Sequence, residues 1–197
     1  MRVIVAKSAG FCWGVKRAVA KARRLRAEQV GPVHTDGPLI HNKQLLAQLA
    51  QEGVRSTARP GRLRHGVLLI RAHGITPARR AQLKRLRLPV YDATCGDVAR
   101  IQGLIRRHAA QGCSTVIFGD KGHAEVTGLL GFAAGRGHVV SQPAEVARLP
   151  ALTKVCLVSQ STQFPDSYAK VAAAIRRRFP GAIVFETICP ATRNRQA

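Results

Sequence analysis

Three cysteines of this chain occupy the same place in a repeated pattern, between a short apolar stretch and the start of a helical pattern. The apolar stretches are residues 2–6, 89–92 and 182–186, and the cysteines that follow them are Cys12, Cys95 and Cys189. Successive cysteines of the repeat are separated by about the length of one small domain, so they indicate repeated domains and not a local CxxC site. Thiols from three units could therefore converge on one centre.

A thiol in this place is suited to bind metal. The N-terminus of a helix lowers the pKa of a cysteine, and the thiolate is the form that binds metal. The carboxyl ends of parallel strands are also where α/β folds place their ligands. The other two cysteines, Cys113 and Cys156, flank or lie in apolar strands, and we predict them to be core residues.

Strand and helix patterns alternate along the chain. Predicted strands cover residues 2–6, 33–35, 67–70, 89–92, 115–118, 137–140, 154–158 and 182–186. Predicted helices cover residues 13–27, 43–51, 97–110 and 166–178, with others beginning at Thr76-Pro77 and after His123, the latter reaching about Ala134. This alternation predicts an α/β fold with parallel sheets and right-handed crossovers. A boundary between two similar units is expected near Cys95.

The charge balance restricts the possible partners. The chain carries 32 basic and 10 acidic residues, a formal net charge of +22. A field of this sign attracts anionic substrates or an acidic protein partner. Nucleic acid is another candidate, but the basic residues are scattered over several helices and only 5% of residues are aromatic, too few for base-stacking platforms. We expect no nucleic-acid partner.

Apolar runs and cysteine number indicate the compartment. No apolar run approaches the ~20 residues of a membrane span, and the chain begins with a strand pattern where a signal peptide would have its apolar region. Five cysteines, an odd number, in a chain without export features argue for reduced thiols. The sequence predicts a cytoplasmic protein without a membrane partner, whose thiols serve metal or redox chemistry.

Polar side chains lie just after strands or at helix starts, on the same edge as the cysteines. They are His41, His73, His123, Glu125 and Ser161. Histidines, hydroxyls and helix N-termini are good ligands for a phosphate or diphosphate. Glu125 follows His123 by two residues and is suited to proton delivery.

Seven motifs in order along the chain carry a family resemblance. They are Gly10-Phe11-Cys12-Trp13-Gly14-Val15-Lys16-Arg17-Ala18-Val19, Gly37-Pro38-Leu39-Ile40-His41-Asn42, Ala72-His73-Gly74, Asp92-Ala93-Thr94-Cys95, Gly122-His123-Ala124-Glu125-Val126, Ser159-Gln160-Ser161-Thr162 and Thr187-Ile188-Cys189-Pro190-Ala191-Thr192-Arg193-Asn194-Arg195-Gln196. Together they resemble the 4-hydroxy-3-methylbut-2-enyl diphosphate reductases of the LytB family, which perform the last step of the non-mevalonate isoprenoid pathway.

The resemblance implies a trefoil of three α/β domains around a 4Fe–4S cluster. It implies that Cys12, Cys95 and Cys189 each ligate one iron and that the fourth iron stays open for the substrate's allylic oxygen. It also assigns the diphosphate to His41, His73, His123, Ser161 and, less directly, Thr162, and proton supply to Glu125. Two electrons and two protons would then remove the hydroxyl as water. The products would be isopentenyl and dimethylallyl diphosphate, with a ferredoxin or flavodoxin as electron donor.

The sequence departs from the family pattern in two places. Gly96-Asp97 replaces the proline-containing sequence that commonly follows the middle cysteine, and the chain ends at Ala197 where family members continue into a third domain. We therefore expect a first unit at residues 1–95, a second at 96–188 and the start of a truncated third at 189–197, with strand 2–6 pairing into that third unit. A chain of this extent is expected to be a poor catalyst.

Two alternatives from other classes of protein stay open. A basic nucleic-acid-binding domain would explain the charge but would leave the repeated cysteines and the Gly122-His123-Ala124-Glu125 loop without a role. A zinc-binding structural domain would explain the thiols. Metal analysis separates zinc from iron and sulfide.

Overall fold

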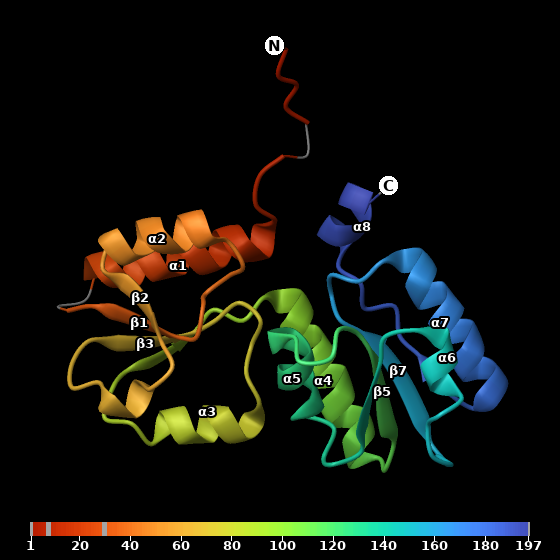
Figure 1. The fold of residues 1–197 in the computed structure, drawn as a ribbon. Helices are drawn as coiled ribbons and strands as arrows, with labels where there is room; N and C mark the ends of the chain where they lie inside the picture. Colours follow the sequence, from red (N-terminus) through yellow and green to blue (C-terminus); the bar gives the residue numbers. More distant parts are fainter. Residues whose placement is uncertain (1, 7–8, 29–30, 197) are drawn as a thin grey trace.

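The computed structural model describes residues 2–6, 9–28 and 31–196. Its strands form two four-stranded sheets with all neighbours parallel, in the orders β2-β1-β3-β4 and β6-β5-β7-β8. The two units lie side by side (Figure 1). The predicted α/β class with parallel sheets is confirmed. None of the described helices has the length and apolar character required to cross a membrane.

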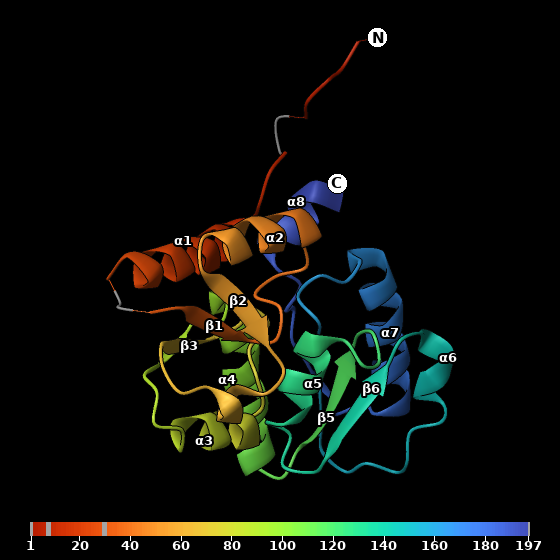
Figure 2. The same cartoon turned by 60° about the vertical axis from the view of Figure 1, so that its left-hand side comes forward.

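The first sheet is covered on both faces because its central strand is apolar at every position. Its strands are β1 (Val33–Asp36), β2 (Val54–Thr57), β3 (Val67–Ile70) and β4 (Val90–Asp92). Alternate side chains of a strand point to opposite faces. Val67 and Leu69 therefore pack with residues of α1 (Trp13–Glu28) and α2 (Lys43–Gln51), whereas Leu68 and Ile70 pack with Leu83 of α3 (Pro77–Lys84). Figure 2 shows α1 and α2 above this sheet and α3 below it.

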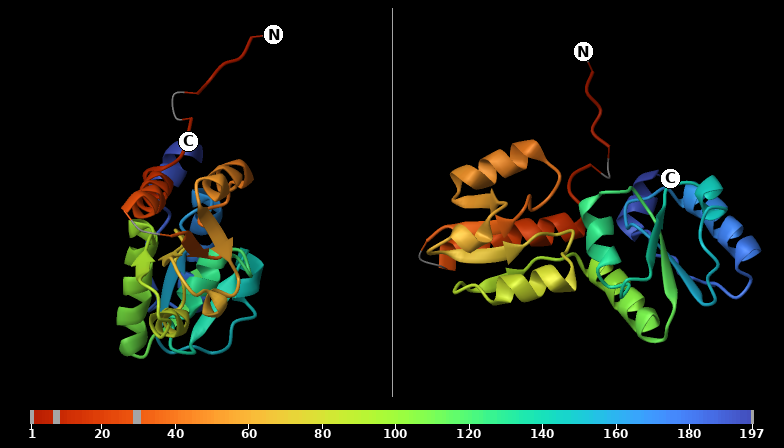
Figure 3. Two further views of the ribbon diagram at one scale, coloured as in Figure 1. Left: turned by 90° about the vertical axis from the view of Figure 1, so that its left-hand side faces the viewer. Right: turned by 60° about the horizontal axis from the view of Figure 1, so that its bottom comes forward.

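The second sheet repeats this arrangement. Its strands are β5 (Ser114–Phe118), β6 (Gly137–Val140), β7 (Val155–Ser159) and β8 (Ile183–Val184). Ile117 and Val158 pack under α4 (Gly96–Ala110) and α5 (Ala124–Leu130), and Val116 and Leu157 pack on the other face with α6 (Pro143–Val146) and α7 (Pro165–Arg178). The last helix is α8 (Pro190–Gln196). Figure 3 shows both units from two further directions.

Most predicted elements occur within a residue or two of their expected bounds, and their ends have local causes. Asn42 caps α2 by accepting a hydrogen bond from the Leu45 N–H at 2.8 Å, and Thr76 caps α3 through the Arg79 N–H at 3.1 Å. Two differences stand out. Strand β2 was not predicted, and α5 ends at Leu130 instead of reaching Ala134.

The prediction of a buried strand at residues 2–6 is wrong. The segment forms no strand, and Val3, Ile4 and Val5 are 72%, 79% and 76% exposed. A strand requires a neighbouring backbone to receive its hydrogen bonds, and no described strand pairs with this segment. Its apolar sequence is therefore not sufficient to make it part of a sheet. The predicted third unit, residues 189–197, contains α8 (Pro190–Gln196), and its last residue, Ala197, lies outside the described residues. The trefoil and the domain bounds at 95 and 188 stay predictions.

Candidate metal and diphosphate site

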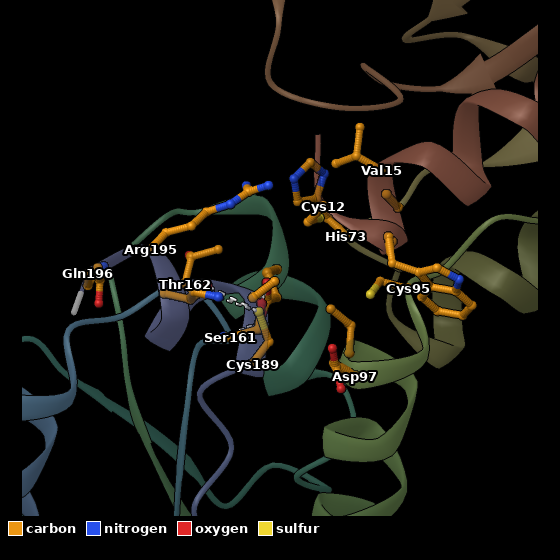
Figure 4. Close-up of a pocket in the computed structure, with 17 residues that line it drawn as sticks. Cys12, Val15, His73, Cys95, Asp97, Ser161, Thr162, Cys189, Arg195 and Gln196 are labelled. Carbon is orange, nitrogen blue, oxygen red and sulfur yellow. Dashed lines mark hydrogen bonds between the residues drawn. The ribbon is translucent and has the colours of Figure 1, made fainter. Parts of the chain in front are cut away.

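One cavity of about 400 Å³ lies between the two units and is lined by all three repeated cysteines. The other predicted site residues that line it are His73, Glu125, Ser161 and Thr162. Figure 4 shows these side chains approaching from both units, with Ser161 and Cys189 on one side and Cys12, Cys95 and His73 on the other. The cavity thus joins residues that lie far apart in the sequence.

Each cysteine stands at the start of a helix, as the repeat predicted. Cys12 precedes α1, Cys95 is the N-terminal cap of α4, and Cys189 precedes Pro190, the first residue of α8. The Cys189 Sγ accepts a hydrogen bond from the Thr192 N–H at 3.3 Å and lies 3.1 Å from the Thr192 hydroxyl. Burial raises the pKa of Cys95, and backbone N–H groups at the start of α4 counteract part of that shift. The free N–H groups of a helix start thereby face the sulfur.

Gly14 allows two of these cysteines to approach each other. A Cβ atom at Gly14 would lie 2.6 Å from the Cys95 Sγ and 3.9 Å from the Cys12 Sγ. A Cβ atom does not fit 2.6 Å from a sulfur atom. Because glycine has no Cβ, the first turn of α1 can pack directly against Cys95. The thiols of Cys12 and Cys95, which belong to different elements, therefore face the same space.

The three cysteines surround a cavity and do not point at a single ion. Among the described ranges 2–6, 9–28 and 31–196, no group of three His, Cys, Asp or Glu side chains is close enough to hold one metal ion. A structural zinc site needs four ligands about 2.0–2.3 Å from one point. A cluster with several irons instead takes one thiolate at each iron. Three thiols lining one cavity fit a cluster better than a mononuclear zinc site.

The three predicted histidines form a cluster although 82 residues separate the first from the last. The ring centroids of His41 and His73 are 4.3 Å apart, those of His41 and His123 are 5.2 Å apart, and those of His73 and His123 are 5.7 Å apart. Burial, with the neighbouring His41, His123 and Arg71, lowers the pKa of His73 to about 3. The pKa of His123 is also lowered, chiefly by burial. Both rings are therefore neutral near pH 7.

The neutral rings have defined places for further hydrogen bonds. His123 caps α5, and its Nδ1 accepts from the Glu125 N–H at 3.1 Å. The neutral ring therefore carries its proton on Nε2, where it can donate. The Nδ1 of His73 is buried and has no hydrogen-bond partner among the residues that the structure describes. A buried polar atom without a partner costs stability, so this nitrogen is a further point at which a ligand or water would bind.

Glu125 is a buried carboxyl group at the beginning of α5. Glu125 is only 2% exposed. The Ser161 N–H donates to Oε1 at 2.7 Å, and the Ser161 hydroxyl donates to Oε2 at 2.8 Å. Burial raises the pKa of Glu125 despite these two hydrogen bonds. A carboxyl group with a raised pKa at the wall of a cavity is suited to deliver a proton.

Three residues near the site were not assigned roles from the sequence. Asp97 lines the cavity next to Cys95, and Arg195 reaches from α8 towards Cys12 and donates to the Gly10 carbonyl at 2.8 Å (Figure 4). Arg71 is close enough to His73 and His123 to influence their pKa values. The position of Arg71 directly after strand β3 was a signal that could have been used, because site residues in this chain follow strands.

Comparison with known proteins agrees with the site. A sequence model of the LytB protein family matches residues 3–197. The 4-hydroxy-3-methylbut-2-enyl diphosphate reductase of Opitutus terrae is 47% identical, over 100% of this chain and 72% of its own length. The enzyme of the same name from Alkaliphilus oremlandii is 34% identical, over 100% of this chain and 71% of its own length.

Two solved structures have the same fold. The E-1-hydroxy-2-methyl-but-2-enyl-4-diphosphate reductase of Plasmodium falciparum superposes with a TM-score of 0.90 at 29% identity, over 95% of this chain and 60% of that one. An (E)-4-hydroxy-3-methyl-but-2-enyl diphosphate reductase, described as the terminal enzyme of the non-mevalonate pathway, gives a TM-score of 0.86 at 35% identity, over 98% of this chain and 70% of that one. Given this match along the whole sequence and fold, the chain belongs to the LytB family of 4-hydroxy-3-methylbut-2-enyl diphosphate reductases.

Proposed function

We propose that this chain takes part in the reductive dehydroxylation of 4-hydroxy-3-methylbut-2-enyl diphosphate. The substrate, two electrons and two protons would give isopentenyl or dimethylallyl diphosphate and water. The observation that carries the proposal is the convergence of three cysteines at helix starts and a buried carboxyl group on one cavity, beside a cluster of three histidines. Membership in the family supports the same reaction.

Cys12, Cys95 and Cys189 would hold a 4Fe–4S cluster. Their position fits this role because all three line the cavity from separate elements, and the missing Cβ of Gly14 leaves room beside two of them. When bound, the cluster supplies the electrons and a Lewis-acidic iron for the leaving hydroxyl. The chain's own contribution is to hold the thiolates with helix-start N–H groups, as Thr192 does for Cys189.

His41, His73, His123, Ser161 and Thr162 would hold the diphosphate. Among the described residues, the Nε2–H of His123 has no hydrogen-bond acceptor, and the rings of His41 and His73 lie within 6 Å of the His123 ring, centroid to centroid. The Ser161 hydroxyl has one proton, and it uses this proton to donate a hydrogen bond to Glu125. Donation to a phosphate oxygen would require that hydroxyl to turn, leaving Glu125 with the backbone N–H of Ser161. Thr162 follows directly and lines the same cavity.

Glu125 would deliver protons to the leaving hydroxyl and to the allylic carbon system. Its raised pKa keeps the protonated form available closer to neutral pH than for an exposed glutamate. Burial excludes water from the carboxyl group, and two hydrogen bonds from Ser161 fix its orientation. Substitution by glutamine would keep the shape and remove the proton.

An acidic one-electron carrier, a ferredoxin or flavodoxin, would supply the electrons in the cytoplasm. The net charge of +22 supports this choice, because opposite net charges accelerate protein association. The partner and the compartment follow from composition and family, and they are tested separately from the cluster.

The experiment that tests the proposal is anaerobic reconstitution with iron and sulfide, followed by metal analysis and a visible spectrum. The wild-type chain should bind iron and sulfide, and serine at Cys12, Cys95 or Cys189 should abolish or severely weaken that binding. Cys113 and Cys156 are buried away from the cavity residues, so serine at these positions is the matched control and should leave iron binding nearly intact. Equal loss for all five variants, or zinc in place of iron, would contradict the proposal.

A further inference from the structure

Arg71 connects two of the loops that carry the histidines. It follows β3 directly and precedes His73 by two residues. Its Nε donates to the Gly74 carbonyl at 3.4 Å, and its Nη1 would lie 2.9 Å from a Cβ at Gly37. Gly37 has φ +76°, which favours glycine, and it opens the loop that leads to His41. The guanidinium group is thus packed between the His73 loop and the His41 loop.

The charge of Arg71 is not balanced by a carboxylate in the part of the chain that the structure describes. Six ion pairs occur among those residues, and none includes Arg71. Asp36, which lines a cavity of about 330 Å³ with Arg71, is held by Arg79 through two hydrogen bonds of 2.7 and 3.1 Å. Arg71 is partly buried, so its positive charge is only partly screened by water.

The histidine cluster needs a cation if it is to bind a diphosphate near neutral pH. Burial is the main cause that lowers the pKa of His73 and of His123, and Arg71 adds a smaller contribution in the same direction, so these rings are neutral donors. Neutral imidazoles offer hydrogen bonds without charge, whereas a guanidinium group keeps its charge at all working pH values. Asp120 acts on His123 in the opposite direction. Arg195, which lines the cavity, already donates to the Gly10 carbonyl.

We propose that Arg71 is a positioning residue of the diphosphate site, which fixes the His41 and His73 loops relative to each other and supplies the positive charge that the neutral histidines lack. This inference rests on the proposed function, since it assumes that the histidines hold the diphosphate. It also gives a role to a cationic side chain that repels His73 and His123 when they are protonated.

Binding of inorganic diphosphate to the full chain tests the inference. Arg71→Gln removes the charge, Arg71→Lys keeps it, and Arg62→Gln removes one exposed charge from the same unit as a matched control. By isothermal titration calorimetry at pH 7.5, Arg71→Gln should weaken binding about tenfold to a hundredfold, the value of a hydrogen bond to a charged group. Arg71→Lys keeps the charge but loses the Nε–H that donates to the Gly74 carbonyl, so it should bind more tightly than Arg71→Gln and more weakly than wild type. Arg62→Gln should bind like wild type.

A histidine titration by NMR provides a readout that a purely structural role would not change. In Arg71→Gln the pKa values of His73 and His123 should rise, because one source of repulsion is gone. Arg71→Lys should restore the wild-type values. Wild-type affinity and wild-type histidine titration in Arg71→Gln would overturn the inference, as would a Lys variant as weak as the Gln variant. A wild-type chain that binds no diphosphate would overturn the proposed function instead, so the two failures are distinguishable.

Discussion

The low pKa of His73 predicts that acid destabilises the folded chain between pH 6.5 and pH 3. His73 has an ordinary pKa of 6.5 and a pKa of about 3 in the fold, chiefly because of burial. In this window the unfolded state binds a proton that the folded state does not, so stability is fully present above pH 6.5 and falls as the pH decreases. At pH 5.5, one unit below the unfolded pKa, the loss from this residue alone should be about 1.4 kcal/mol relative to pH 7.5.

The assay is urea unfolding of wild type and His73→Asn at both pH values. The asparagine variant removes the titrating group, so the difference between its unfolding free energies at pH 7.5 and pH 5.5 should be smaller than the wild-type difference by about 1.4 kcal/mol. His138→Asn, on β6 of the other sheet, is the matched control. Because His73 is unchanged in this variant, its unfolding free energy should still include the loss of about 1.4 kcal/mol between pH 7.5 and pH 5.5. A His73→Asn variant with the full wild-type dependence on pH would refute the reasoning.

Three further outcomes follow from other contacts. Gly14→Ala places a Cβ 2.6 Å from the Cys95 Sγ, so the variant should bind less iron and sulfide. In Gly103→Ala, in α4, the added Cβ meets no described atom within 4 Å, and the unfolding free energy should rise by ~0.5–1 kcal/mol. Ser161→Ala removes the hydroxyl that donates to Glu125 at 2.8 Å; carboxyl-carbon NMR should show a further rise in the Glu125 pKa, and an unchanged titration would contradict the assignment of that bond. Reduction of the reconstituted chain by an acidic carrier should slow steeply as salt rises, since the net charge is +22, and a rate independent of salt would count against electrostatic docking.

Local sequence determined the helix starts, including those at which the cysteines stand. Caps such as Asn42 and Thr76 act within three residues of themselves, and such short-range hydrogen bonds can be recognised in the sequence without knowledge of the fold. The repeated strand, cysteine and helix pattern likewise placed Cys95 at the first turn of α4. The parallel α/β class followed from the alternation of elements.

Tertiary structure decided where the local patterns were weak or ambiguous. Strand β2 was missed because Val54 is its only buried residue, so it has little apolar pattern to recognise. Helix α5 ends early where Gly131 packs against Thr76, with a would-be Cβ 2.6 Å from the Thr76 Cβ. Residues 2–6 have the apolar composition of a strand but no partner among the described strands. In each case a distant neighbour, and not the segment itself, determines the conformation.

The candidate site shows the same division between sequence and fold. The sequence placed His41, His73 and His123 after strands or at helix starts, but it could not bring their rings within 6 Å of each other. The distances from His123 to the other two rings depend on the packing of one sheet unit against the other, whereas His41 and His73 meet through loops of the first unit. The burial of Glu125 and the contact of Arg71 with Gly37 likewise depend on residues that are distant in the sequence. Sequence therefore determined the chemistry available to this chain, and long-range packing determined its spacing and its pKa values, because burial and Coulomb interactions depend on distances that the order of residues does not contain.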